Sequence, residues 1–132
     1  MLFPWRKKMV SKKVLVVDDE QHILFILEQE LKQHGCVVQK ANSGKDAIKL
    51  LDSNVYDIVI LDIMMPEVSG IDVCRHLRSK PKMKDKPVVI LTADQDEKNK
   101  EECVSLDVAD YITKPFSPKN LSSRVKEILD KY

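Results

Sequence analysis

Residues 56–66 read YDIVILDIMMP, a short apolar run that ends in a carboxylate and is closed by a proline. Residues 58–61 are apolar at every position, which is typical of a strand covered on both faces of a parallel sheet. Asp62 then lies at the carboxyl end of this strand, where open α/β sheets hold their ligand sites. The pattern makes Asp62 a candidate functional residue, although a carboxylate that merely caps a loop fits this stretch equally well when it is taken alone.

Three further short predicted strands, residues 13–17, 88–91 and 109–113, also lead to side chains that carry a charge or a hydroxyl. These side chains are, in order, Asp18 with Asp19, Thr92, and Lys114. The carboxyl ends of parallel strands meet at one edge of a sheet, so we expect these residues to lie close to Asp62.

Helical patterns separate the strands. They span residues 20–34, from Ser43 onward, from Ser69 to about residue 79, about 96–106, and from Ser117 onward. With a further strand at residues 36–41, five short strands alternate with five helices, which predicts a parallel sheet wrapped on both faces. We therefore expect an α/β, doubly wound, flavodoxin-like fold whose five-stranded sheet has the order 2-1-3-4-5.

The chain of 132 residues suits one domain, which we place at residues 13–132 after an N-terminal tail at residues 1–12. The apolar run in this tail is too short, and Pro4 interrupts it, so the sequence predicts neither a signal peptide nor a membrane span. A net charge of +1 disfavours binding to nucleic acid. Three cysteines without CxxC spacing favour reduced thiols, so we expect a cytoplasmic protein without membrane contact.

The expected cluster of carboxylates needs a counter-charge. Two unit charges about 4 Å apart cost on the order of 4 kcal/mol at an effective dielectric of about 20. The oxygen-only ligands Asp18, Asp19 and Asp62 favour a hard cation such as Mg²⁺, which phosphate oxygens often complete. Lys114 and Thr92 supply the cation and the hydroxyl that hold a phosphoryl group during transfer. Asp62, in the centre, is the candidate nucleophile.

Four motifs in this order are more specific than any single residue: VVDDE at 16–20, LDIMMP at 61–66, LTA at 91–93 and DYITKPF at 110–116. At these separations residues 13–131 resemble the receiver domains of bacterial two-component response regulators. The resemblance implies a signalling phosphoacceptor rather than an enzyme. Asp62 would take its phosphoryl group from the phosphohistidine of a sensor histidine kinase or a histidine phosphotransfer protein, by a transfer that the receiver itself catalyses, and would lose it slowly.

The resemblance also implies the metal site and the switch. One Mg²⁺, and no other cofactor, would be held by four groups: Asp18, Asp19, Asp62 and the backbone carbonyl of Met64. Lys114 would pair with the phosphoryl oxygens, Thr92 would move inward to bond them, and Tyr111 would turn inward with it. The change would be read on the face made by the last two helices and the strand between them.

Further details follow from the same likeness. The Lys114–Pro115 bond is expected to be cis. The family often has glycine in the turn before the last strand; Asp107 stands there, and aspartate tolerates left-handed backbone better than most residues. Residues 116–125 resemble receivers that dimerise above a winged-helix DNA-binding domain, so we expect a phosphorylation-dependent homodimer. The chain is then either a stand-alone receiver or part of a longer regulator, with no nucleic-acid contact of its own.

Three other classes of protein share parts of this pattern. A receiver-like interaction module that does not use phosphate is the main alternative, and a damaged pocket would be its sequence mark. A haloacid-dehalogenase-like phosphatase needs a second aspartate where this chain has Met64. A flavodoxin-like nucleotide binder needs a Gly-rich phosphate loop, and the chain has three glycines in all.

Overall fold

In the computed structural model, which describes residues 9–132, five parallel strands form one sheet in the order β2-β1-β3-β4-β5. The strands are β1 (Lys13–Val17), β2 (Val37–Ala41), β3 (Ile58–Leu61), β4 (Val88–Thr92) and β5 (Asp110–Thr113). The helices are α2 (Gln21–Gln33), α3 (Gly44–Ser53), α4 (Gly70–Ser79), α5 (Glu97–Ser105) and α6 (Pro118–Leu129). The predicted doubly wound α/β fold and its strand order are confirmed.

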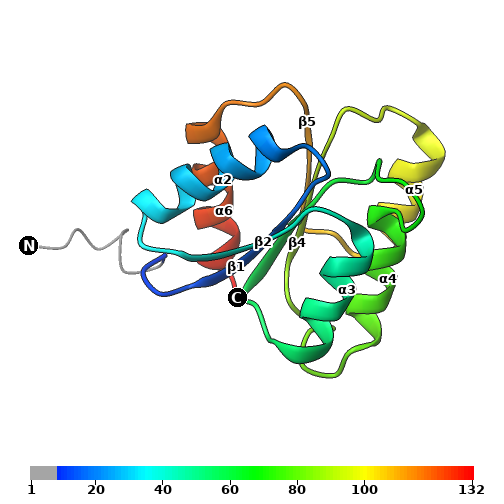
Figure 1. The fold of residues 1–132 in the computed structure, drawn as a ribbon, viewed down its shortest axis with the longest axis horizontal. Helices are drawn as coiled ribbons and strands as arrows, with labels where there is room; N and C mark the ends of the chain where they lie inside the picture. Colours follow the sequence, from blue (N-terminus) through cyan, green and yellow to red (C-terminus); the bar gives the residue numbers. More distant parts are fainter. Residues whose placement is uncertain (1–8) are drawn as a thin grey trace, which may run out of the picture.

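The helices cover both faces of the sheet, with α2 and α6 on one side and α3, α4 and α5 on the other (Figure 1). Successive side chains of a strand point to opposite faces. In β3, Ile58 and Ile60 accordingly pack under α2 and α6, whereas Val59 and Leu61 pack under the other three helices. This two-sided burial explains why the central strands are apolar at every position instead of at alternate ones.

Helices α3 and α4 begin directly after Ser43 and Ser69, the serine caps that the sequence pattern predicts. The Ser69 hydroxyl accepts a hydrogen bond from the Asp72 amide and the Asp72 carboxylate accepts one from the Ser69 amide, which completes a capping box. At Ser43 only the bond from the Asp46 amide to the serine hydroxyl is present. The longest helix, α2, has 13 residues, and no helix within residues 9–132 combines the length and the apolar character needed to cross a bilayer.

The segment just before β1 belongs to the packed structure, although the sequence pattern places it in a tail. Met9 is 1% exposed and lies among the apolar side chains under α2 and α6, and the Ser11 amide donates to the Gly35 carbonyl. Met9 and the Ser11 amide thus anchor the end of the expected tail to the domain, and the tail at residues 1–12 stays a prediction, of which residues 1–8 lie outside the described residues.

The side chain of Arg78 connects the turn after α5 to the loop that follows α4. The guanidinium of Arg78 donates to the backbone carbonyls of Leu106, Asp107, Lys84 and Lys86, at 2.7–3.1 Å. Asp107 has a φ of 59°, so this aspartate adopts the left-handed backbone conformation expected in the turn before β5. The Arg78 contacts hold that turn and the loop of residues 80–86 in place.

Candidate functional site

The strand ends bring two acids and one lysine into contact at the carboxyl edge of the sheet. The Lys114 ammonium, which follows β5, lies 2.7 Å from Asp18 Oδ2 and 3.3 Å from Asp62 Oδ2. Because β1 and β3 are neighbours and β5 lies beyond β4, the lysine side chain reaches across the end of β4 to meet both carboxylates. The bond between Lys114 and Pro115 is cis, as predicted.

These charged groups are removed from water. Asp18 is 1% exposed and Asp62 is 4% exposed. Burial raises the pKa of Asp18 above its usual value and the charge of Asp62 adds to this effect, although a hydrogen bond from Lys114 opposes it. Burial alone would lower the pKa of Lys114, but the hydrogen bond to Asp18 and the charges of both carboxylates raise it. One ammonium therefore serves two carboxylates, and the site keeps an excess of negative charge.

That excess is concentrated at the start of the loop after β1. Carboxylate oxygens of Asp18, Asp19 and Glu20 lie within 4.8 Å of one another, and Glu20 also lies 3.6 Å from the Lys114 ammonium. The three side chains offer only oxygen donors, which fits a hard divalent cation such as Mg²⁺. Asp62 is not part of this cluster within the described residues. Glu20 was quoted in the sequence motif but not as a site residue, and its position directly after two acids was the available signal.

The loop that follows Asp62 is closely packed against the start of α4. The Met64 amide donates to Asp62 Oδ1 at 3.3 Å, and the Met64 side chain is 59% exposed beside it. A Cβ atom on Gly70 would lie 2.0 Å from the Asp62 carbonyl oxygen, so only glycine fits there. The sequence analysis did not single out Gly70, because a Ser-Gly pair at a helix start is ordinary.

Thr92 and Tyr111 are joined to Asp94 instead of to the acidic cluster. The Thr92 hydroxyl, which is fully buried, accepts a hydrogen bond from the Asp94 amide at 3.2 Å. The Tyr111 hydroxyl donates to the Asp94 carbonyl at 2.9 Å, and burial together with the charge of Asp94 raises the pKa of this tyrosine. The Asp94 carboxylate in turn accepts from the Asn99 side chain of α5 at 2.6 Å. Both predicted switch residues, at the end of β4 and in β5, thus bond to Asp94 in the loop that leads into α5.

These features define a class of protein: a doubly wound α/β domain that carries two buried acids and a lysine at the carboxyl edge of its sheet. The family model described as the response regulator receiver domain matches residues 14–126. The chain therefore belongs to the receiver domains of two-component response regulators, as the motifs indicated, and such domains act in signalling.

Similar proteins agree with this assignment. The alkaline phosphatase synthesis transcriptional regulatory protein PhoP of Bacillus subtilis is 41% identical over 120 residues, which are 91% of this chain and 49% of that protein. The chain thus spans about half the length of this curated relative. The receiver domain of the Francisella response regulator 1452 is 35% identical with a TM-score of 0.81, over 92% of this chain and 98% of that one. The BeF3-activated DrrB receiver domain is 33% identical with a TM-score of 0.80, over 92% and 99%.

Proposed function

We propose that Asp62 is the phosphoacceptor and that it takes its phosphoryl group from the phosphohistidine of a sensor histidine kinase or a histidine phosphotransfer protein. The observation that carries this proposal is the contact of the Lys114 ammonium with both Asp18 and Asp62. It fixes a buried carboxylate beside a positive charge at the edge of the sheet where a ligand can approach. Family membership supports the same role.

In the transfer, a carboxylate oxygen of Asp62 attacks the phosphorus atom and the bond from phosphorus to the histidine nitrogen breaks. The electron pair of that bond remains on the imidazole, and an aspartyl phosphate forms. Lys114 neutralises and orients the oxygens of the group in transit. Mg²⁺, held by Asp18, Asp19, Asp62 and the Met64 carbonyl, would supply further positive charge to those oxygens.

Phosphorylation then acts on the conformation through Thr92 and Tyr111. With a phosphoryl group on Asp62, the Thr92 hydroxyl leaves the Asp94 amide and bonds a phosphoryl oxygen, and Tyr111 leaves the Asp94 carbonyl and turns inward. Because Asp94 also holds Asn99 of α5, the rearrangement shifts α5 and the surface formed by α5, β5 and α6. The phosphoryl group is thus a ligand for one of two conformations.

Two side chains near Asp62 bear on the lifetime of the phosphoryl group. Met64 is exposed beside the acceptor, and Asp94 follows Thr92 by two residues. We propose that these side chains control how water reaches the phosphorus atom, so that the receiver removes its own phosphoryl group slowly. The phosphorylated chain is proposed to form a homodimer through the surface of α5, β5 and α6.

Intact-mass measurement tests the phosphoacceptor role. The wild type, Asp62→Asn and Asp85→Asn are incubated with acetyl phosphate and Mg²⁺, where Asp85 is an exposed acid on the loop after α4. We expect one added phosphoryl group on the wild type and on Asp85→Asn, and none on Asp62→Asn or when EDTA removes the metal. An unmodified wild type would refute the proposal and favour the phosphate-independent interaction module.

A further inference from the structure

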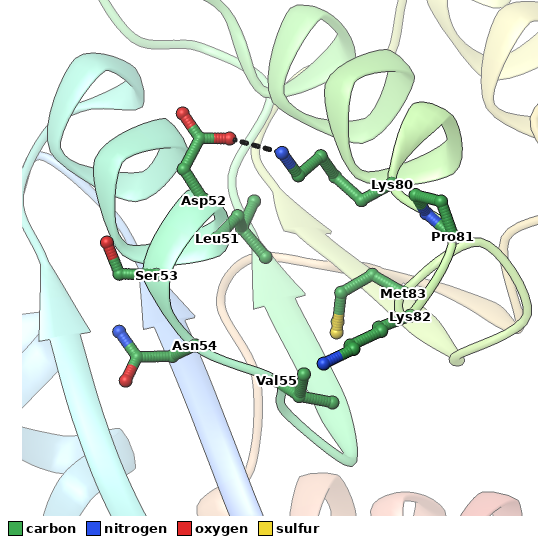
Figure 2. Close-up of a pocket in the computed structure, with 9 residues that line it drawn as sticks. All are labelled: Leu51, Asp52, Ser53, Asn54, Val55, Lys80, Pro81, Lys82 and Met83. Atoms are coloured by element: carbon green, nitrogen blue, oxygen red, sulfur yellow. Dashed lines mark ion pairs between the residues drawn. The ribbon is translucent and has the colours of Figure 1, made fainter.

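A cavity of about 350 Å³ lies at the edge of the sheet opposite to Asp62 (Figure 2). It is formed by the C-terminal end of α3 and the loop after α4, just before β3 and β4 begin. Leu51 and Met83 line it but are only 2% and 1% exposed, so its accessible apolar surface comes from Val55, which is 41% exposed, and from the exposed Pro81. The volume falls at the lower end of the roughly 300–1,000 Å³ that ligand pockets occupy. The cavity can therefore receive one apolar group.

The walls of this cavity are held by bonds that do not depend on a ligand. The Tyr56 amide donates to the Met83 sulfur at 3.3 Å, and the amides of Met83 and Lys84 both donate to the Lys80 carbonyl. The Arg78 guanidinium donates hydrogen bonds to the Lys84 and Lys86 carbonyls of the same loop. A ligand would meet a preformed site, so little ordering of the protein would oppose its binding.

The rim of the cavity is positively charged. Lys80 and Lys82 line the cavity with one acid, Asp52, and Lys84 and Lys86 follow on the same loop with Asp85. The rim acid Asp52 is already engaged by Lys80 at 3.0 Å and by His76 at 2.7 Å. Lys82 has no carboxylate partner within residues 9–132, and Figure 2 shows its ammonium beside Val55. The positive charge on this rim is thus open to an acidic ligand.

We propose that this cavity is a docking pocket for an acidic peptide segment of a protein partner. One apolar side chain of the segment packs against Val55 and Pro81, and flanking Asp or Glu residues pair with Lys82 and the neighbouring lysines of the loop. No aromatic side chain of residues 9–132 lines the cavity, which favours a peptide over nucleic acid, because single-stranded nucleic acid is held largely by stacking of its bases on aromatic side chains. The pocket is separate from the phosphoacceptor site, so docking does not depend on phosphorylation.

Short peptides test the proposal by amide NMR of the full chain. The probes are Asp-Glu-Xaa-Glu-Asp peptides with blocked ends, in which Xaa is Leu, Ile, Met or Phe, and a matched peptide with Ser at the centre. We expect saturable shifts of the amides of Asn54, Val55 and Met83 with at least one apolar peptide. Binding of the Ser peptide should be weaker by about tenfold or more, which is the effect of leaving one large apolar side chain unburied.

Matched variants separate the pocket from general charge attraction. Val55→Asp should weaken the best peptide by about tenfold, whereas Val104→Asp, at an exposed valine of α5 outside the cavity, should not change its affinity. Lys82→Glu should weaken binding several-fold, and Lys119→Glu, at an exposed lysine of α6, should not.

Four results would overturn the proposal. They are the absence of saturable shifts with every peptide, equal binding of the Ser and the apolar peptides, shifts confined to the Asp62 edge, and tighter binding of a single-stranded oligonucleotide to the same loop. The Asp62→Asn variant should bind the best peptide as the wild type does. The two proposals can therefore fail independently.

Discussion

Asp18 is the residue at which the charge balance of the site can be measured. Burial raises its pKa above the ordinary value of 3.8, so the folded state binds a proton at Asp18 more tightly than the unfolded state does. This tighter proton binding stabilises the fold fully at pH values below the pKa that Asp18 has in the unfolded state. The stabilisation is lost as the pH rises through the pKa that Asp18 has in the folded state. Above the pKa of the folded state, the ionised Asp18 therefore destabilises the metal-free fold relative to the protonated form.

Asp18→Asn should consequently raise the melting temperature of the metal-free protein at pH 7 by a few degrees. The gain should shrink as the pH is lowered toward about 4, because the wild-type carboxyl then takes up its proton. Asp85→Asn, at an exposed acid far from Lys114, should leave the melting temperature nearly unchanged. A lower melting temperature for Asp18→Asn than for the wild type would show that the contact with Lys114 outweighs the cost of burial.

Gly70 is the second residue with a measurable role. In Gly70→Ala the new methyl group would meet the Asp62 carbonyl oxygen, and relief requires the backbone of the acceptor loop to shift. We expect a loss of about 2 kcal/mol in the free energy of unfolding, which is typical of overpacking in a tight site. Urea denaturation measures it, with Lys49→Ala on the exposed side of α3 as the control. Equal stability of Gly70→Ala and the wild type would contradict the close packing of this loop.

At the scale of elements, Arg78 joins α4 to the turn after α5. Arg78→Lys keeps the charge but cannot donate to four carbonyls, so several carbonyls lose a donor, two of them partly buried, and the free energy of unfolding should fall by about 1–3 kcal/mol. Arg75→Lys is the matched control on the same helix. The Arg75 side chain is 54% exposed and its guanidinium pairs with Asp72 and Glu102, so this change should cost less than about 1 kcal/mol. Similar losses for both variants in urea denaturation would refute the role of Arg78.

The elements themselves could be read from the sequence because their signals are local. Serine caps, one-sided apolar helices and the continuous apolar run of residues 58–61 each predicted an element that the structure contains. Contacts between distant segments carried no such signal. The burial of Met9 under α2 and the approach of Gly70 to Asp62 depend on packing that no local pattern encodes.

The same limit applies to the site. The convergence of Asp18, Asp62 and Lys114 followed from the strand order alone, because parallel strands end at one edge. The direction of the Thr92 side chain could not be predicted in this way. Its hydroxyl can bond either the Asp94 amide or a phosphoryl group on Asp62, and in this conformation it bonds the Asp94 amide. Sequence position places a side chain at an edge, but the local competition for hydrogen bonds decides where it points.

At the scale of the whole molecule, the two proposed sites lie at opposite edges of the sheet. The acidic cluster lies beyond the carboxyl ends of the strands, and the lysine-rimmed cavity lies before their amino ends. With a net charge of +1, the chain has no strong overall field, so each site acts through its local charge.

The surface of α5, β5 and α6 leads to a prediction about assembly. Val104 is 71% exposed on α5, and Arg124 of α6 pairs with Asp110 of β5 at 3.1 Å. Beryllofluoride with Mg²⁺, used as a phosphoryl mimic, should shift the protein from monomer toward dimer in chromatography with light scattering. Val104→Asp should prevent the shift, and Val55→Asp, at the opposite edge, should not. A wild type that stays monomeric with the mimic would contradict the proposed homodimer.

Mapping of the modified residue tests the central claim most directly. After incubation with acetyl phosphate and Mg²⁺, the protein is reduced with borohydride, which converts an aspartyl phosphate to homoserine, and the peptides are sequenced by mass spectrometry. We predict homoserine at position 62 and nowhere else. Homoserine at position 18 or 19 instead, or no converted residue at all, would contradict the assignment of Asp62 as the phosphoacceptor.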